Sequence, residues 1–178
     1  LYSPNKPINT TQYYPAHMLL RHRGPDDEGF SYLDEDEDIV FAKGNDTIDY
    51  FQNLPHIQSI EKTKLILGQR RLAIIDLSKD GHQPFNFEEL SMVFNGELFN
   101  YKDLRKELEE LGYRFRTASD TEVVIKAFHY WRNDAFNRFN GFWAISIYDN
   151  NTKTLTISRD RFGIKPLFYH FENGVLYF

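Results

Sequence analysis

The sequence predicts an α+β fold, a four-layer αββα sandwich in which two antiparallel sheets are flanked by helices. The first observation behind this prediction is the order of segments: β-type segments follow one another up to residue 95, helical segments lie within 101–131, and β-type segments then return. Parallel sheets would instead show alternating strands and helices. The second observation is the segment FWAISIY, 142–148, which is apolar on both of its alternating faces. A strand of this kind needs a covering layer on each side, which favours a sandwich.

The first half of the chain consists mostly of predicted strands. A short helix over 16–21 is expected to end before Gly24-Pro25, because proline disfavours helix in the residue before it. Four segments rich in apolar and β-branched residues are predicted strands: 29–33, 39–42, 64–69 and 71–77. The five consecutive acids at 34–38 predict a solvated hairpin tip. The polar segment 43–62 is typical of an insertion, and the sequence leaves its role open.

Two helices are predicted in the second half, each from its cap and its apolar spacing. A strand over 91–95 is expected to end at Asn95-Gly96, and a helix over 101–111 follows with Asn100 as its cap. The segment SDTE is expected to open the second helix as a capping box. The Ser119 side chain would cap the first turn, and the Glu122 side chain would accept the backbone N–H of Ser119. Hairpins are predicted around 149–152 and around Asn173-Gly174.

Composition restricts the class of protein. A chain of 178 residues with 16% aromatic residues can bury its own core. Its net charge of −5 argues against a nucleic-acid partner, which requires a clustered basic face. No apolar run approaches the roughly 18 residues of a membrane span, so we expect no membrane partner and a cytoplasmic location. The six histidines lack metal-ligand spacing and no phosphate-binding loop occurs, so we expect no metal or cofactor in this domain.

Asn95 and Gly96 are the candidate catalytic residues. An asparagine carboxamide next to an unhindered glycine N–H offers two donors to a developing oxyanion, although a simple turn into the following helix would use the same residues. Arg71 can bind a carboxylate with two parallel hydrogen bonds, and Asp120 in the first turn of a helix can hold an ammonium group while the helix end keeps it ionised. Either residue alone also suits an ordinary surface role. Together the four residues fit a free α-amino acid.

Six segments in the same order carry a resemblance to a known family: RHRGPDDEG, QRRLAIIDLS, GHQPF, FNGELFNY, SDTEV and RDRFGIKPLFY. They resemble the glutamine-hydrolysing domain of asparagine synthetases, which are class II amidotransferases of the N-terminal nucleophile hydrolase superfamily. The resemblance runs from about residue 21 to the end, except for the insertion. On this resemblance, residues 1–178 form one glutaminase domain. We expect that domain to be incomplete at both ends.

The resemblance implies glutamine as the substrate and assigns the site residue by residue. Arg71 would bind the glutamine α-carboxylate, in a pocket lined by Leu72, Ile74 and Ile75. Asn95 and Gly96 would form the oxyanion hole. The remaining assigned residues, Glu97 and Asp120, would hold the α-amino group.

The family also implies partners outside this chain. Ammonia would pass to a C-terminal synthetase domain of the same protein, where ATP and magnesium serve to amidate aspartate. A homodimer is an assembly that the resemblance allows.

One departure from the family concerns the nucleophile. In the family it is a cysteine at the mature N-terminus, and this chain contains no cysteine. Either residues preceding Leu1 supply it, or the domain lacks it, as in the related β-lactam synthetases, and serves as a non-catalytic module. The acceptor is also open, since relatives of this kind can amidate other molecules such as sugar acids.

Overall fold

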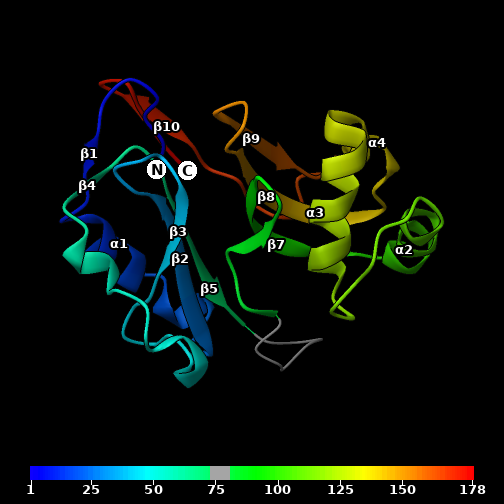
Figure 1. The fold of residues 1–178 in the computed structure, drawn as a ribbon, viewed down its shortest axis with the longest axis horizontal. Coiled ribbons are helices and arrows are strands. Elements are labelled where there is room, and N and C mark those ends of the chain that lie inside the picture. The colour runs from blue at the N-terminus through cyan, green and yellow to red at the C-terminus, as the bar shows by residue number, and fades with distance from the viewer. Residues whose placement is uncertain (73–80) are drawn as a thin grey trace. The chain divides into compact units, whose positions relative to one another are not determined.

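The computed structural model describes residues 1–72 and 81–178, which form two compact units (Figure 1). Unit 1 comprises Leu1–Pro84 and Phe168–Phe178, and unit 2 comprises Phe85–Leu167. Each unit combines antiparallel strands with helices. The predicted α+β class with antiparallel sheets is therefore confirmed, and each unit is described below by itself.

Unit 1 is built on a three-stranded antiparallel sheet of order β3-β2-β5. Its main elements are α1 (Tyr13–Met18), β2 (Asp27–Leu33), β3 (Ile39–Ala42) and β5 (Ile66–Arg71). Two small sheets pair β1 (Ile8–Asn9) with β4 (Lys62–Thr63) and β10 (His170–Glu172) with β11 (Val175–Tyr177). The described part of unit 1 also contains the short 3-10 helices η1 (Arg21–Arg23), η2 (Asp49–Phe51) and η3 (Ile57–Ser59). One apolar cluster joins the sheet to α1 and η3, through Phe30, Ala42, Ile66, Tyr14 and Ile57.

Unit 2 is built on a four-stranded antiparallel sheet of order β6-β7-β8-β9. Its strands are β6 (Phe85–Phe87), β7 (Leu90–Leu98), β8 (Gly141–Asp149) and β9 (Thr154–Arg159). Its helices are α2 (Tyr101–Glu110), α3 (Asp120–Trp131), η5 (Arg132–Asp134) and α4 (Ala135–Arg138).

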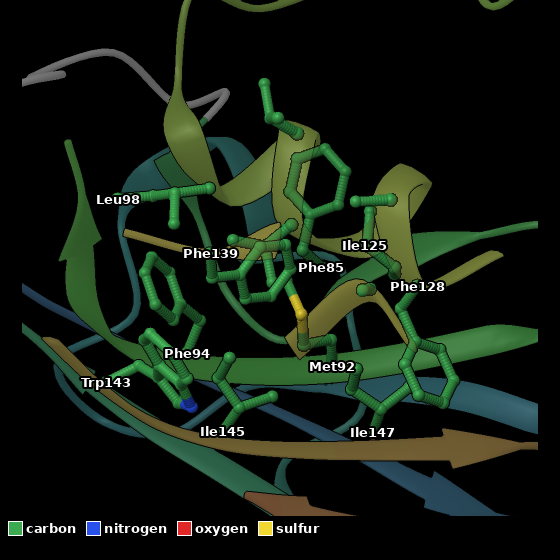
Figure 2. Packing of buried hydrophobic residues seen from close by; sticks show 14 of the residues in the cluster. Phe85, Met92, Phe94, Leu98, Ile125, Phe128, Phe139, Trp143, Ile145 and Ile147 are labelled. Atoms are coloured by element: carbon green, nitrogen blue, oxygen red, sulfur yellow. The ribbon is translucent and has the colours of Figure 1, made fainter. Parts of the chain in front are cut away.

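The core of unit 2 lies between its helices and one face of its sheet, as Figure 2 shows. The side chains that the sheet contributes include Met92 and Phe94 of β7 and Ile145 and Ile147 of β8. Helix α3 supplies Ile125 and Phe128 to the same cluster. Leu104 and Leu108 of α2 belong to it too, as their helical spacing predicts. Burial of this cluster fixes the strand β7 and the start of α3, the two elements that carry the predicted unit 2 site residues.

The predicted hairpins are confirmed. At the acidic tip between β2 and β3, Asp34 Oδ1 accepts the N–H groups of Asp36 and Asp38, both at 3.0 Å. Asn173 and Gly174 have φ of 52° and 78° between β10 and β11, as a tight hairpin turn requires. The predicted helix over 16–21 lies earlier, at Tyr13–Met18. Of the strand predicted over 71–77, residues 73–77 lie outside the described residues.

The two predicted helix caps are wrong in part. Asn100 precedes α2 but makes no capping bond, because its side chain accepts the Asn140 N–H and donates to the Arg138 carbonyl, both at 3.0 Å. Ser119 does cap α3, accepting the Thr121 N–H at 3.1 Å. Glu122 does not complete the capping box, because its carboxylate is buried and accepts hydrogen bonds from other donors. Long-range contacts replace the cap at Asn100, whereas Glu122 bonds to the preceding loop and to Lys126 in its own helix.

No helix within residues 1–72 and 81–178 combines the length and the apolar character that crossing a membrane requires.

Candidate functional site

Asn95, Gly96 and Glu97 lie inside a strand rather than in a turn. The expectation that the strand ends at Asn95-Gly96 is wrong: β7 continues to Leu98 and pairs with β8 throughout. Asn95 stands opposite Ala144, and Gly96 stands opposite Trp143. The helix α2 begins only at Tyr101, so the strand reaches almost to the helix.

The Gly96 N–H points away from β8. At the two ends of the β7–β8 ladder, Asn150 N–H donates to Glu89 O and Phe99 N–H donates to Asn140 O, both between residues directly opposite each other. Hydrogen-bonded pairs alternate along an antiparallel ladder, so the odd-numbered residues of β7 bond to β8 and Gly96 does not. Trp143, opposite Gly96, fits this alternation. Its N–H donates to the Asp160 carboxylate and its carbonyl accepts the Asp160 N–H, both on the β9 side.

The edge that the Gly96 N–H faces is open within the described part of the chain. β6 pairs with β7 only over Leu90–Met92, so no described strand pairs with the edge opposite Gly96. The next N–H on this edge, from Leu98, donates to Asp120 Oδ2 at 3.0 Å. The Asn95 side chain is exposed. At this end of β7 the Asn95 carboxamide is therefore exposed, and the Gly96 N–H faces an edge without a described strand partner.

Glycine is required at position 96 by the closeness of β8. A Cβ built there would overlap the Phe142 carbonyl oxygen and would lie 2.8 Å from both the Phe94 ring and Trp143 Cα. Contacts below about 3 Å force the backbone apart. Gly96 thus permits a close approach of two strands, and its sequence neighbour Asn95 does not form a turn with it.

Asp120 begins α3 and lies against the end of β7. It follows the cap Ser119 and accepts the Leu98 N–H. Burial raises the pKa of Asp120, the N–H groups of Leu98 and Thr121 oppose this rise, and the negative charge of Glu97 adds to it. The sequence predicted that the helix end would keep Asp120 ionised, but burial outweighs that effect and the pKa is raised. Glu97 and Asp120 are thus two carboxyl groups close enough to repel each other, an arrangement that a cation would stabilise.

Glu122 organises the loop that leads to Asp120. Its carboxylate accepts the N–H groups of Arg116 and Thr117 at 3.1 Å and 2.8 Å, and it pairs with Lys126 at 2.6 Å. Glu122 is 1% exposed and Lys126 4% exposed. Burial alone would raise the pKa of Glu122, but Lys126 and Thr117 outweigh it and hold the pKa below its ordinary value. The sequence predicted Glu122 only as a capping residue and gave no sign of this role.

Arg71 ends β5 in unit 1, directly opposite Asp27 of β2. The Asp26 N–H donates to the Arg71 carbonyl at 3.1 Å. Leu72, predicted to line the carboxylate pocket, is 57% exposed. The other two predicted lining residues, Ile74 and Ile75, lie outside the described residues.

Arg70, beside Arg71, anchors a buried ion network that the sequence analysis did not identify. Its Nη1 lies 2.8 Å from Glu28 Oε2, and its Nη2 lies 2.6 Å from Asp46 Oδ2. Burial alone would raise the pKa of Glu28, but hydrogen bonds, His17 first, and the charge of Arg70 hold it below its ordinary value. The two consecutive arginines therefore differ: Arg70 is a structural cation, and Arg71 is the candidate ligand for a carboxylate.

The motif RDRFGIKPLFY contains a second unpredicted anchor, Asp160. Its carboxylate accepts four backbone N–H groups, from Trp143, Phe162, Ile164 and Lys165. Burial alone would raise the pKa of Asp160, but these donors hold it at about 2. Asp160 thus fixes the loop after β9 against the strand that pairs with β7.

The predicted site residues divide between the two units. Arg71 and Leu72 belong to unit 1, whereas Asn95, Gly96, Glu97 and Asp120 belong to unit 2. Unit 2 brings its four residues together at the end of β7. That the unit 1 residues and the unit 2 residues line one common pocket stays a prediction. Within the described residues, no group of three or more His, Cys, Asp or Glu side chains is arranged to hold a metal ion.

Comparison with known sequences gives a consistent set of relatives. A profile of the family described as glutamine amidotransferase domain matches residues 55–178. Glutamine-hydrolyzing asparagine synthetase 1 of Bacillus subtilis is 36% identical over 163 residues, covering 90% of this chain and 21% of that protein. Putative glutamine-hydrolyzing asparagine synthetase 2 of Methanocaldococcus jannaschii is 31% identical over 175 residues, covering 89% of this chain and 28% of that protein. The chain thus spans about a fifth to a quarter of the length of these curated relatives.

A solved structure shares the fold. Glutamine phosphoribosylpyrophosphate amidotransferase from B. subtilis, complexed with ADP and GMP, superposes with a TM-score of 0.71 at 28% identity. The match covers 92% of this chain and 37% of that chain.

Proposed function

Because this chain belongs to the glutamine amidotransferase domain family, whose pattern covers residues 55–178, we propose that it is the glutaminase domain of an asparagine synthetase. In this role it hydrolyses glutamine to glutamate and ammonia. The similarity to glutamine-hydrolyzing asparagine synthetases over most of the chain supports this branch of the family.

The observation that carries the proposal is the edge of β7 on the side away from β8, which no described strand pairs with beyond Met92. An accessible carboxamide from Asn95 lies next to the Gly96 N–H, which faces away from β8 toward an edge that no described strand occupies. Two preorganised donors of this kind stabilise the negative oxygen of a tetrahedral intermediate. A strand end serving only as a connection to a helix would not need to leave this N–H accessible.

The reaction begins when a cysteine thiolate attacks the carboxamide carbon of glutamine. The carbonyl oxygen becomes an oxyanion, which accepts hydrogen bonds from Asn95 Nδ2 and the Gly96 N–H. The C–N bond breaks, the nitrogen takes up a proton and leaves as ammonia, and a glutamyl thioester remains. Water hydrolyses the thioester to glutamate and regenerates the thiol. This chain contains no cysteine, so the nucleophile belongs to residues outside it.

The substrate is held through its charged ends. The Arg71 guanidinium binds the α-carboxylate, with Leu72, Ile74 and Ile75 lining that pocket, and the carboxyl groups of Glu97 and Asp120 hold the α-ammonium group. Burial and the negative charge of Glu97 raise the pKa of Asp120, which supports this role because an ammonium group would offset both effects.

The remaining parts of the proposal concern the complete protein. Its C-terminal synthetase domain uses ATP and magnesium to activate aspartate and receives the ammonia released here. The complete protein is cytoplasmic and is able to form a homodimer.

The test is Asn95→Ala in the complete protein, assayed for glutamine hydrolysis and for ammonia-dependent asparagine synthesis. Losing one oxyanion donor is expected to lower glutaminase turnover by roughly 10²–10³-fold while ammonia-dependent synthesis continues. Asn151→Ala, at an exposed asparagine of the β8–β9 turn, is the matched control and should leave both activities unchanged. Normal glutaminase turnover in Asn95→Ala would defeat the oxyanion assignment.

The non-catalytic alternative makes a different prediction. A domain without any nucleophile would release no ammonia from glutamine even in the complete wild-type protein. Isotope release from amide-labelled glutamine distinguishes the two functions directly, and a second assay with aspartate replaced by a sugar acid identifies the acceptor.

A further inference from the structure

We propose that the buried pair Asp27–His82 is a positioning device for Arg71. The pair holds the segment that begins at Gly81 against the Arg71 guanidinium, and thereby sets the affinity for the substrate carboxylate. All of these residues belong to unit 1. The inference rests on the proposed role of Arg71 in binding glutamine.

The contact between Gly81 and Arg71 is the starting point. A Cβ built on Gly81 would overlap Arg71 Nη2 and would lie 2.6 Å from its Cζ. The guanidinium therefore lies directly on the backbone of residue 81, in the space that a side chain at this position would occupy. Any shift of this segment changes the direction in which the guanidinium presents its N–H groups.

His82 holds that segment in place through Asp27. His82 Nδ1 lies 2.7 Å from Asp27 Oδ2, and the two residues are 8% and 2% exposed. Asp27 is also the residue directly opposite Arg71 in the β2–β5 ladder. One carboxylate therefore links the segment behind the guanidinium to the strand next to Arg71. A hydrogen bond to an ionised group in a buried site is strong enough to fix such a segment.

Close backbone packing adds to the clamp. A Cβ built on Gly29 of β2 would overlap the Gln83 carbonyl oxygen and would approach the His82 imidazole at 2.5 Å. His82 and Gln83 thus lie on the surface of β2 in a space that a glycine leaves free. The position of His82 is fixed by packing as well as by its hydrogen bond.

The insertion 43–62 supplies the other wall of this clamp. Phe51 of η2 stacks on the His82 ring, with centroids 4.1 Å apart and planes inclined by 27°. The Ile48 N–H donates to Asp27 Oδ1 at 3.1 Å, so both carboxylate oxygens of Asp27 are occupied. A segment whose role the sequence leaves open therefore supports the residues that hold Arg71.

A misplaced guanidinium weakens substrate binding more than it slows the chemistry. Bidentate recognition of a carboxylate depends on the orientation of a planar group, whereas the oxyanion donors Asn95 and Gly96 lie in the other unit. Loss of the clamp is therefore expected to raise KM for glutamine with little change in kcat. It should not affect a substrate without an α-carboxylate.

The experiment measures glutaminase kinetics of the complete protein with L-glutamine and with L-glutamine α-methyl ester, whose carboxylate charge is masked. In His82→Ala, KM for glutamine is expected to rise about tenfold, as for the loss of one hydrogen bond to a charged group. The preference for glutamine over the ester should fall by the same factor. His82→Asn places an N–H near the position of Nδ1 and should recover most of the preference. His170→Ala, at an exposed histidine of β10, is the matched control.

The outcomes separate the clamp from the proposed function. Wild-type protein without glutaminase activity refutes the proposed function, and an Arg71→Ala protein that still prefers glutamine over the ester refutes the role of Arg71. The clamp alone is refuted if the wild type is active and His82→Ala raises KM for glutamine and for the ester by the same factor. It is also refuted if His82→Ala changes neither KM. Should His82→Ala fail to fold, Phe51→Ala replaces it. A rise in glutamine KM smaller than tenfold, with the ester unaffected, supports the clamp, and an unchanged KM overturns it.

Discussion

The two halves of the candidate site are built in different ways. In unit 2, Gly96 presents a backbone N–H, and Asp120 is placed by the end of β7 and the start of α3. In unit 1, the Arg71 guanidinium lies against Gly81, in the segment that the buried Asp27–His82 pair holds. Backbone groups are positioned by the sheet itself, whereas a long side chain needs other side chains to hold it.

This difference predicts two kinds of sensitivity. The unit 2 half should tolerate changes of charge outside its carboxyl groups but not added volume, because β7 and β8 approach closely at Gly96. The unit 1 half should tolerate changes at the surface but not the removal of a buried charge, because each charge neutralises another. Substitutions in the two units can therefore be compared directly.

The largest effect is expected for Gly96→Ala. The new methyl group would overlap the Phe142 carbonyl oxygen and press against Trp143 Cα, so β7 and β8 must separate. Overpacking of this kind costs about 3 kcal/mol or more of unfolding free energy, and glutaminase activity should be lost with the displaced oxyanion donors. Denaturant unfolding and glutaminase assays of the complete protein measure the two effects.

Gly112→Ala is the matched control for this substitution. Gly112 has a φ of 96° and nothing within 4 Å of a built Cβ, so alanine there costs only backbone strain of about 1 kcal/mol. If Gly96→Ala were no more destabilising than Gly112→Ala, the close approach of the two strands would be wrong.

The sequence predicted a turn at position 96, but the structure needs a glycine there for a different reason. Asn-Gly favours turns, so the strand was expected to stop there. Pairing with β8 overrides that local preference, and the glycine is needed because of the opposing Phe142 carbonyl. Strand partners far along the chain decide such a case, and a single segment does not reveal them.

Much of the fold was readable from local patterns, but the buried charges were not. The apolar run of β8, the spacing of leucines in α2 and the turn residues of two hairpins are local features and predicted these elements correctly. Glu28 and Asp27 lie in a polar stretch that gave no sign of burial. Their partners Arg70 and His82 are 42 and 55 residues away, so only the folded chain brings the charges together.

A smaller effect is expected when one buried carboxylate in each unit becomes neutral. Glu28→Gln removes a charge beside Arg70, and Glu122→Gln removes the charge beside Lys126. Each should lower the unfolding free energy by about 3 kcal/mol at neutral pH, because Lys126 loses the counter-charge of its ion pair and Arg70 keeps only that of Asp46. The two variants should then differ in substrate recognition. Glu28→Gln should weaken carboxylate-dependent binding through Arg71, and Glu122→Gln should weaken ammonium-dependent binding through Asp120.

Both halves of that expectation are measurable. L-glutamine α-methyl ester lacks the carboxylate charge, and glutaramate lacks the α-amino group, so the two analogues report on the two variants separately. The pKa values of Glu28 and Glu122 are lowered in the folded protein. Their stabilising effect is therefore present above the unfolded value of about 4.3 and is lost as the pH falls through the folded pKa. The stability difference between each variant and the wild type should shrink at acid pH, and equal differences at all pH values would contradict the pairing.

The smallest effect concerns acid pH and the Asp120 half of the site. Because the pKa of Asp120 is raised above the ordinary value of about 3.9, its carboxyl group becomes neutral at a higher pH than an exposed aspartate does. In the free protein the ionised group costs stability at neutral pH, and this cost fades as the pH falls through the raised pKa. For binding the sign is opposite, since only the ionised form attracts an ammonium group. KM for glutamine should therefore rise by about tenfold as the pH falls through this pKa, whereas KM for glutaramate should not. Asp120→Asn should remove this difference between the substrates, and an identical acid limb for glutamine and glutaramate in the wild type would show that Asp120 does not bind the amino group.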